Sequence, residues 1–431
     1  MKYLRHTADT VGLKNIGHMQ DITTTIQLES LRPAKPSWRI AYITETFPPD
    51  INGVALTVAK TVETLRARGH EIQLIRPRNA NDPAGRGSDP MQEFLVRGAP
   101  IPLYKQLKLG LPAKRALVQL WSRRRPDLVH IATEGPLGWS ALQAARKLKL
   151  PVCTDFRTNF HAYSQYYGLG WLKGAIFSYM KKFHNIAHCT MVPTLETYEQ
   201  LQSMGFDRLQ VVARGVDTEL FSPNRRSDFL RNQWGASPST LVLLSVGRLA
   251  AEKNLDLVVQ SYRQIRSYVK DCKLVFVGDG PYRATLQSQC SDAVYAGFRT
   301  GSDLANHYAS ADLFLFPSLT ETFGNVTLES LSSGLPTVAF EHAAARELVI
   351  SGQHGLLADA KDPNHFISQA IKISVDSNLR IQLKSQARLR ALDMGWSSIA
   401  EKLEDVYQTM AGLEDNVSIT TTRPVMYDLV R

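Results

Sequence analysis

Two successive parts of the chain each alternate short apolar runs with stretches of helical periodicity, and this alternation constrains the fold most. In the first part, the apolar run 40–43 is followed by apolar residues at helical spacing over 54–65. Such runs are typical of strands buried on both faces of a parallel sheet, and the helices between them complete βαβ units. The strands predicted in this part are 40–43, 72–75, 127–132, 152–156 and Cys189–Val192.

The second part repeats the alternation. Residues 211–223, VVARGVDTELFSP, interrupt the periodicity, and we place a domain boundary there. A chain of 431 residues exceeds what one core usually organises, so two domains of roughly 150 to 200 residues each are expected. The expected fold class is therefore α/β, with two Rossmann-like domains. The strands predicted in this part are Leu241–Val246, 274–277, Leu313–Phe316 and Thr337–Phe340.

Five segments follow from these boundaries. The lead-in lacks an apolar period and the tail is polar, so both are expected to be flexible. Apolar residues at helical spacing predict a final helix before the tail. The segments are an extension at 1–37, a first Rossmann-like domain at 38–210, a second at 211–393, a final helix at 394–412 and a tail at 413–431.

Composition places the chain among ordinary globular proteins. Hydrophobic residues make up 44% and charged residues 21%. No apolar run reaches the ~18 residues that cross a bilayer, and no secretory signal is visible. The four cysteines are widely spaced, which argues against disulfides or a zinc site. We expect a cytoplasmic protein without cofactor. The net charge of +10 favours an anionic partner without identifying it.

Loops that lead from strands into helices carry the chemistry, because ligands of open parallel sheets bind beyond the carboxyl ends of strands. After the first predicted strand, Asn52 and Gly53 allow the backbone to approach a ligand, although Asn-Gly is also common turn chemistry. After Leu241–Val246, Arg248 and Lys253 place two cations five residues apart. A guanidinium and an ammonium group at this position suit a diphosphate.

A third loop, 320–329, follows Leu313–Phe316 and carries two carboxylates. Glu321 is expected at the mouth of a helix, and Glu329 lies eight residues, or about two turns, further along. One carboxylate can reach a sugar while the other accepts hydrogen bonds from ribose hydroxyls. Favourable acidic residues in a first helical turn would explain Glu321 but not Glu329, which lies in an apolar stretch.

Taken together, these stretches resemble the retaining glycosyltransferases of the GT-B fold in glycosyltransferase family four, especially the bacterial GDP-mannose-dependent alpha-mannosyltransferase branch. The resemblance implies two Rossmann-like domains that face each other across a deep cleft, and a last helix that crosses back to the first domain. The matching stretches are ITETFPPDINGV (43–54), VHIATEGPLG (129–138), VGRLAAEKN (246–254), VFVGDGP (275–281), ASADLFLFPSLTETFGNVTLESLSSGLPTVA (309–339) and HGLL (354–357).

The resemblance also implies roles for individual residues. Arg248 and Lys253 would bind the donor diphosphate and stabilise it as the leaving group, and Glu329 would hold the ribose. Gly53 would approach the diphosphate from the first domain. The transferred sugar would meet Glu321 and the amides around Phe323, Gly324 and Asn325. On the acceptor side the implied residues are Asn52, Glu134 and Arg157, and the catalytic set is Arg248, Lys253, Glu321, Arg157 and His161.

One position departs from the family. In TDFRTNF (154–160), many relatives carry a histidine where this chain has Arg157, beside the reacting sugar carbon. Arginine cannot act as a base at accessible pH, so a histidine-assisted step at this position is excluded. Three interpretations stay open: His161 takes over part of that role, Arg157 contacts an anionic group of the donor or acceptor, or Arg157 is a surface or structural arginine.

We therefore predict a retaining hexosyltransferase that moves mannose from GDP-mannose, a nucleotide diphosphate sugar, to a lipid-linked or glycan acceptor. The alternative is transfer of glucose, galactose or sulfoquinovose from UDP-sugars to glycolipids. Charge that develops on the leaving diphosphate would be stabilised by Arg248, Lys253 and helix N-termini. The chain contains no Asp-x-Asp pair, so turnover without a metal ion is expected. A phosphorylase or hydrolase of this fold would need a different reactive group.

Other classes fit the sequence less well. A nicotinamide oxidoreductase needs Gly-x-Gly-x-x-Gly, and GDGPYR (278–283) lacks the third glycine. Basic residues are dispersed without a nucleic-acid motif, so no nucleic-acid partner is expected, and a non-enzymatic protein that binds nucleic acid or an anionic surface stays the alternative from another class. Residues 103–126 interleave basic residues with leucines, which suits either docking on the inner face of a membrane or a solvated helix face.

Overall fold

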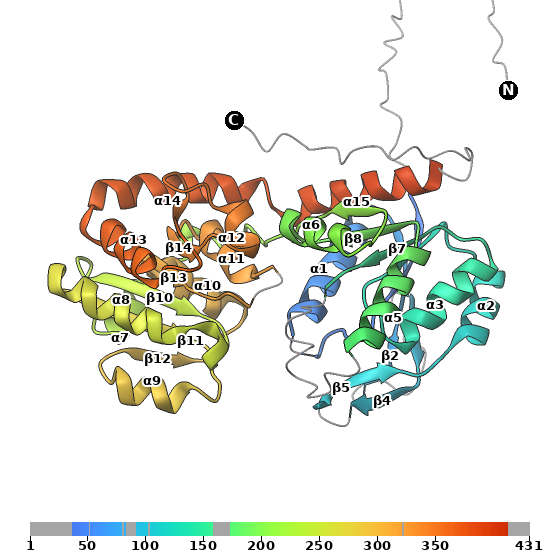
Figure 1. Ribbon diagram of the computed structural model, residues 1–431, viewed down its shortest axis with the longest axis horizontal. Helices are drawn as coiled ribbons and strands as arrows, with labels where there is room; N and C mark the ends of the chain where they lie inside the picture. Colours follow the sequence, from blue (N-terminus) through green and yellow to red (C-terminus); the bar gives the residue numbers. More distant parts are fainter. Residues whose placement is uncertain are drawn as a thin grey trace, which may run out of the picture. The chain divides into compact units, whose positions relative to one another are not determined.

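Two parallel sheets covered by helices organise the chain in a computed structural model (Figure 1). The structure describes residues 37–50, 52–79, 82, 92–101, 104–157, 173–320 and 323–412.

The first sheet lies within residues 39–211. Among the described residues its strands run in the order β3-β2-β1-β6-β7-β8-β9, with every neighbouring pair parallel. The strands are β1 (Arg39–Ile43), β2 (Glu71–Pro77), β3 (Gln92–Val96), β6 (Leu128–Ile131), β7 (Val152–Asp155), β8 (Cys189–Val192) and β9 (Leu209–Val211). The helices are α1 (Gly53–Ala67), α2 (Lys114–Arg123), α3 (Pro136–Lys147), α5 (Lys173–Ile186) and α6 (Leu195–Ser203). Strands β4 (Gly98–Ile101) and β5 (Tyr104–Gly110) form a separate antiparallel pair.

The second sheet lies within residues 241–358. Its described strands run in the order β12-β11-β10-β13-β14-β15, again all parallel. The strands are β10 (Leu241–Val246), β11 (Cys272–Val277), β12 (Val294–Gly297), β13 (Leu313–Phe316), β14 (Thr337–Phe340) and β15 (Gly355–Ala358). The helices are α7 (Asp228–Gln233), α8 (Leu255–Tyr268), α9 (Arg283–Gln289), α10 (Gly301–Ser310), α11 (Asn325–Ser332), α12 (Ala343–Leu348), α13 (Pro363–Val375) and α14 (Ser377–Leu392).

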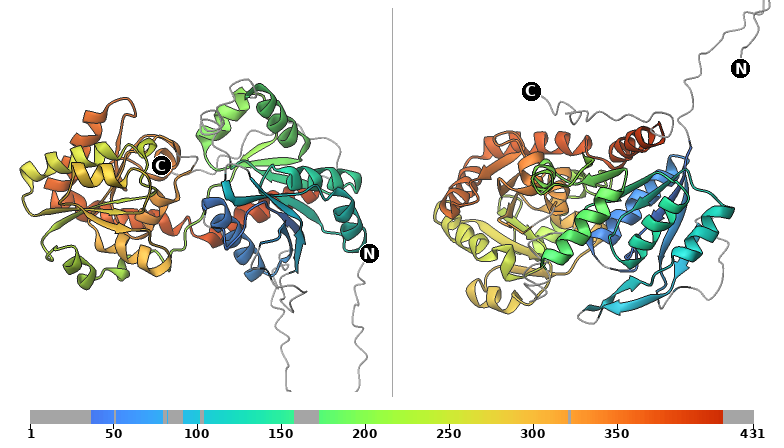
Figure 2. Two further views of the ribbon diagram at one scale, coloured as in Figure 1. Left: turned by 90° about the horizontal axis from the view of Figure 1, so that it is seen from below. Right: turned by 45° about the vertical axis from the view of Figure 1, so that its right-hand side comes forward.

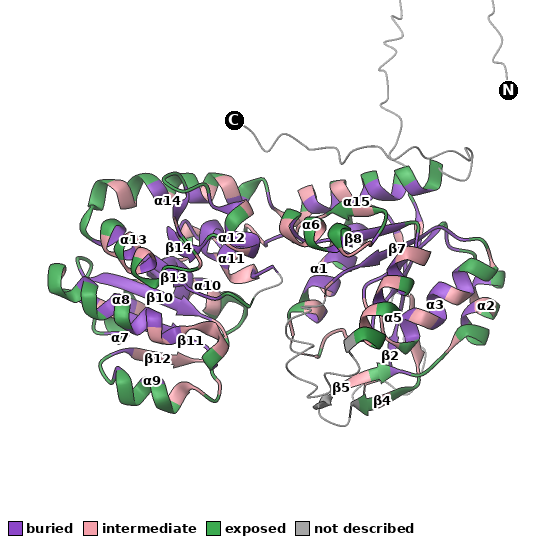
Figure 3. Cartoon of the chain, viewed as in Figure 1, coloured by how far each residue is buried: buried purple, intermediate pink, exposed green. Residues whose placement is uncertain are grey.

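Helices on both faces explain why the central strands are apolar throughout. In β10, Leu243 belongs to the core on one side of the sheet and Leu244 to the core on the other, because successive side chains of a strand point to opposite faces. Figure 3 shows buried strands beneath helices whose outer faces are exposed. The predicted fold class, α/β with two Rossmann-like domains, is confirmed.

The last helix, α15 (Trp396–Ala411), packs mainly on the first sheet, while Ile399 in its first turn joins the core of the second. Its Leu403 and Tyr407 share a core cluster with Trp38 of the first sheet. Figure 2 shows the red α15 beside the blue α1, and the two helices are in contact. Arg68 donates to buried Glu404 of α15 through Nε at 2.5 Å and Nη2 at 2.9 Å. An ion pair between partly buried Arg68 and buried Glu404 therefore joins α15 to the residue that follows α1.

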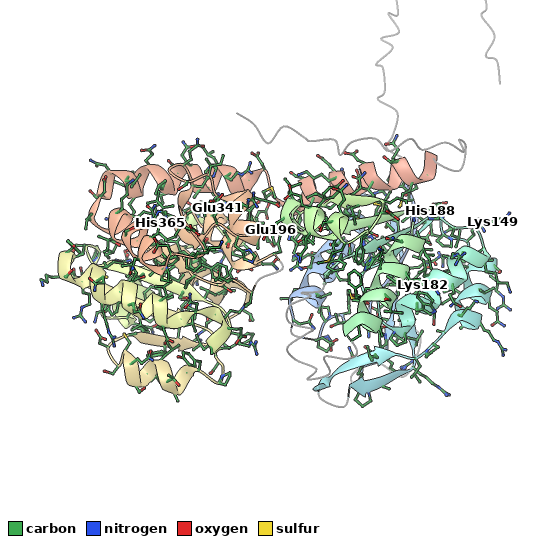
Figure 4. The ribbon with its side chains drawn as sticks, in the orientation of Figure 1. Lys149, Lys182, His188, Glu196, Glu341 and His365 are labelled. Atoms are coloured by element: carbon green, nitrogen blue, oxygen red, sulfur yellow. The ribbon has the colours of Figure 1, made fainter. Side chains whose placement is uncertain are left out.

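The first N–H group of helix α6 and that of helix α12 each donate to a glutamate of the other helix. Glu196, labelled in Figure 4, lies in the first turn of α6 and accepts a hydrogen bond from Ala343 N of α12 at 2.8 Å. Glu347 of α12 in turn accepts one from Leu195 N of α6. The first N–H groups of a helix have no partner within it, so each glutamate satisfies a donor of the other helix.

Candidate functional site

Strand order in the second sheet reverses between β10 and β13. Strands β11 and β12 extend the sheet on one side of β10, and β13, β14 and β15 extend it on the other. At such a point the connections leave in opposite directions, and a crevice opens beyond the carboxyl ends of the two strands. The loops that begin at Gly247 and Pro317 both start there.

A pocket of about 250 Å³ lies at this position. The structure brings Arg248 and Lys253 together there with Gly324 and Asn325, which lie far away in the sequence. We call it the donor pocket, after the ligand that the sequence predicts for these residues. Its lining residues are Ser245, Val246, Gly247, Arg248, Lys253, Leu255, Phe316, Pro317, Gly324, Asn325 and Val326.

The loop after β10 is compact. Gly247 has a φ of +148°, in the region that favours glycine, and its N–H donates to Val277 O at 3.0 Å. A short 3-10 turn, Ala251–Lys253, then ends at Asn254, whose φ of 55° turns the chain into α8. The Arg248 side chain is 54% exposed and pairs with Glu252 one turn later. Both cations thus belong to one short, ordered loop.

The start of α11 adds backbone donors to the donor pocket. Gly324 precedes the helix with a φ of +88°, and as a glycine it has no side chain that could cap the first N–H groups. The N-terminus of a helix carries partial positive charge and suits an anion, here next to two cations. The Phe323 ring is buried in the core and does not line the donor pocket, so Phe323 can meet a ligand there only through its backbone.

The two predicted carboxylates have different outcomes. Glu321 lies outside the described residues. Glu329 is partly buried on α11, where it accepts a hydrogen bond from Tyr308 Oη at 2.9 Å, and it is not among the residues that line the donor pocket. Burial raises the pKa of Glu329 to about 7, and the hydrogen bond from Tyr308 opposes that rise. Its ribose-binding role stays a prediction.

The first sheet also reverses its strand order, between β1 and β6. Asn52 lies after β1, where its Oδ1 accepts from Val54 N at 3.1 Å and Ala55 N at 2.8 Å, so its carboxamide caps α1. A Cβ added at Gly53 would meet no atom within 4 Å, which leaves room for a ligand. Glu134 follows β6 and is partly exposed.

Glu45, which the sequence motifs did not single out, belongs to the loop after β1 and reaches the start of α3, which follows the loop after β6. It is 8% exposed and accepts hydrogen bonds from Leu137 N at 2.9 Å and from Gly110 N. A Cβ added at Gly135 would approach Glu45 Oε1 to 2.3 Å, so the glycine gives the carboxylate access to the start of α3. Burial raises the pKa of Glu45 to about 7, although the two N–H donors oppose that rise.

The raised pKa of Glu45 makes stability depend on pH. Between about pH 4.5 and 7 the folded protein keeps a proton that the unfolded chain has released, so raising the pH lowers the free energy of unfolding. We expect the wild type to lose on the order of 3 kcal/mol of stability relative to Glu45→Gln across this window. Urea denaturation of both proteins at pH 5 and 8 measures the difference between their free energies of unfolding. If this difference were the same at both pH values, the prediction would be wrong.

Arg157 lies at the carboxyl end of β7 and folds onto Asp155, to which it donates through Nε at 2.9 Å and Nη2 at 2.5 Å. His130 Nε2 lies 3.0 Å from the same Asp155 oxygen, and His130 Nδ1 lies 2.6 Å from Tyr407 Oη of α15. Burial alone would raise the pKa of Asp155, but Arg157 and His130 outweigh it and lower that pKa. The ionised carboxylate therefore accepts from His130 Nε2–H.

A small cavity of about 30 Å³ adjoins this chain of polar groups, and Arg157 and Arg214 both line it. Arg157 does not line the donor pocket. The predicted substitute for the family histidine, His161, lies outside the described residues.

The basic segment 103–126 includes α2, whose Leu117 and Trp121 are buried in the core of the first sheet. Its Lys114, Arg115 and Arg123 are exposed. In the described part of the chain no helix is both long and apolar enough to span a bilayer. The same residues hold no group of three or more His, Cys, Asp or Glu placed to bind a metal ion.

Arg214 and the Asp155–His130 pair were missed for a common reason. Arg214 lies in the aperiodic connection 211–223 and contacts Asn325, which is 111 positions later in the sequence. Asp155 and His130 lie within apolar strands, and only the pairing of β6 with β7 brings them together. Single residues of this kind carry no spacing signal.

The chain matches two described families. Residues 51–220 match the family described as Glycosyltransferase Family 4, and residues 240–376 match the one described as Glycosyl transferases group 1. The first match covers the end of the loop after β1 and the whole loop after β6, and the second covers the loops that form the donor pocket.

Relatives and solved structures agree with these matches. A GDP-mannose-dependent alpha-mannosyltransferase of Mycobacterium tuberculosis is 34% identical over 87% of this chain and 97% of its own length. A sulfoquinovosyl transferase of Arabidopsis thaliana is 28% identical over 72% of this chain and 62% of its own. The structure of sucrose-phosphate synthase from Thermosynechococcus elongatus superposes with a TM-score of 0.71 at 19% identity, over 87% of this chain and 99% of that one, which indicates a common fold.

Proposed function

The chain belongs to the family 4 glycosyltransferases, and from this premise we propose that it transfers mannose from GDP-mannose, with retention of configuration, to a lipid-linked or glycan acceptor. The donor pocket is the observation that carries the proposal. Two cations and a helix N-terminus that begins at a glycine meet there at a reversal of strand order, which is where a nucleotide diphosphate binds in open parallel sheets.

The chemistry of the proposed transfer follows from charge. As the bond between the sugar carbon and the phosphate oxygen breaks, positive charge builds on the sugar and negative charge on the leaving diphosphate. Arg248 and Lys253 line the pocket in which that second charge would appear, together with the first amides of α11. Cations and N–H donors that are already in place before the reaction stabilise such charge without having to reorganise. This electrostatic stabilisation usually accounts for a large part of the rate acceleration.

Mannose from GDP-mannose is favoured over the UDP-sugar alternative by the mannosyltransferase relative, which is more similar and covers more of the chain than the sulfoquinovosyl transferase. Thermal unfolding with each donor tests the choice. GDP-mannose at 100 times its Kd is expected to stabilise the protein by about 2.7 kcal/mol, and UDP-glucose at the same concentration by much less. The reverse order would favour the alternative.

A release assay tests the transfer itself. We expect GDP to be released only when an acceptor is present, and release at the same rate without acceptor would indicate a hydrolase instead. A lipid extract and a soluble glycan serve as the two acceptor classes. The exposed basic residues of α2 support a lipid-linked acceptor on an anionic surface.

The same assay tests whether turnover is independent of a metal ion, as the sequence predicts. Activity that is lost in EDTA and restored by Mg²⁺ or Mn²⁺ would contradict that prediction.

A further inference from the structure

Arg214 contacts the turn that opens α11. Its guanidinium lies over the Phe323 ring, with Cζ 5.6 Å from the ring centroid. Its Nη1 donates a hydrogen bond to Asn325 Oδ1 at 3.3 Å. Gly324 and Asn325 line the donor pocket, whereas Arg214 does not. Arg214 therefore reaches the donor pocket through the turn and not directly.

The backbone around Arg214 is fixed by the segment that begins α15. A Cβ added at Gly215 would lie 2.7 Å from the Trp396 ring, so chain and indole are in close contact. Val216 N donates to Met394 O at 3.0 Å, and Val216 forms a bridge with Gly395. A side chain that starts from so constrained a backbone can hold a partner in one orientation.

The hydrogen bond decides which end of the Asn325 carboxamide can serve a ligand. A guanidinium offers donors only, so Asn325 must turn its oxygen, Oδ1, toward Arg214. The Nδ2 amino group is then the end left for a ligand in the donor pocket. Amino groups donate to phosphate oxygens, whereas an amide oxygen in the same place would repel them.

We propose, on the basis of the function proposed above, that Arg214 is a positioning residue for the donor diphosphate. It holds the turn from Phe323 to Asn325 and directs Asn325 Nδ2 toward the phosphate oxygens. If Arg214 only held the connection 211–223 against the second sheet, its loss would lower stability without changing the affinity for the donor. Measurements of Tm and of the donor Kd therefore distinguish a structural role from a positioning role.

An isosteric variant gives the sharpest test. In Asn325→Asp, one carboxylate oxygen accepts a stronger, charge-assisted hydrogen bond from Arg214, while the other presents negative charge to the donor pocket. We expect the Kd for GDP-mannose to rise by more than 10-fold by isothermal titration, and the Tm to stay unchanged or rise. A fall in Tm with no change in Kd would overturn the proposal.

Variants of Arg214 complete a thermodynamic cycle. Arg214→Met is expected to raise the Kd by about 5- to 10-fold and Arg214→Lys by less, because lysine keeps the charge but not the planar group. In the Asn325→Ala background, Arg214→Met should have little further effect, since the two residues act through one contact. Equal effects in both backgrounds would overturn the proposal.

Two control variants distinguish a failure of the proposal for Arg214 from a failure of the proposed function. Arg225→Met changes an arginine just after the connection 211–223 that lines neither the donor pocket nor the small cavity, and this variant should bind donor as the wild type does. Lys253→Met should weaken binding. If it does so while Arg214→Met binds normally, the proposal for Arg214 fails and the proposed function stands. A wild type that binds neither GDP-mannose nor UDP-glucose overturns both.

Discussion

Replacing Lys253 with methionine is expected to lower the kcat of sugar transfer by about 10²- to 10³-fold. Lys253 lines the donor pocket beside Arg248 and the start of α11, where the leaving diphosphate would gain negative charge. Methionine keeps most of the apolar stem but removes the ammonium. Because the side chain lies in a pocket rather than in a core, the Tm should change little. Steady-state kinetics with saturating donor, together with thermal unfolding, measures both effects.

Lys270→Met is the matched control. Lys270 is an exposed lysine in the same half of the chain, just before β11, and does not line the donor pocket. Its loss should leave kcat within about twofold of wild type, because exposed charges contribute little. A Lys253→Met enzyme as active as the Lys270→Met enzyme would remove the basis for placing the diphosphate at the reversal between β10 and β13.

The largest loss of stability is expected from Glu404→Ala, at about 3 kcal/mol. Glu404 is 5% exposed and accepts from Arg68 twice, and His70 Nε2 lies 3.1 Å from the same carboxylate. Alanine would leave the half-buried guanidinium and the buried imidazole without this acceptor. Urea denaturation of the purified protein gives the free energy of unfolding directly.

Glu401→Ala is the control that shows whether the burial of Glu404, rather than its charge alone, accounts for the loss of stability. Glu401 lies one turn earlier on α15 and approaches the same Arg68 to 3.5 Å, but its side chain is 55% exposed. Its removal should cost less than about 0.5 kcal/mol, since exposed ion pairs contribute little. Equal losses from both variants would show that burial of Glu404 does not account for its effect.

The sequence predicted the central strands well and the edge strands poorly. Predicted strands Leu241–Val246 and Leu313–Phe316 coincide with β10 and β13 because residues buried on both faces form continuous apolar runs. Strand β3, QEFLV, is only partly buried, and β9 has three residues with two of them exposed. Such short, half-solvated strands lack a clear apolar period, and pairing with a neighbour defines them.

The candidate site was predictable where chemistry follows a strand directly. Arg248 and Lys253 come immediately after β10, and Asn325 begins the helix after β13, so the order of elements alone places them together. Tertiary contacts decide the rest. Glu329 pairs with Tyr308 from a different helix, and Arg214 reaches the donor pocket only through Phe323 and Asn325. The sequence contains no local pattern for either contact.

The return of α15 to the first sheet limits how hybrid enzymes can be built from this chain and a relative. A single crossover between the halves would bring in a foreign last helix, which would have to fit Trp38, Arg68 and His70 of the recipient. A chimaera that exchanges only the second sheet and its helices needs two crossovers, one near Val216 and one near Gly395. These two residues already pair in a bridge. An exchange of the second sheet therefore moves an internal segment of the chain and leaves α15 with its own first sheet.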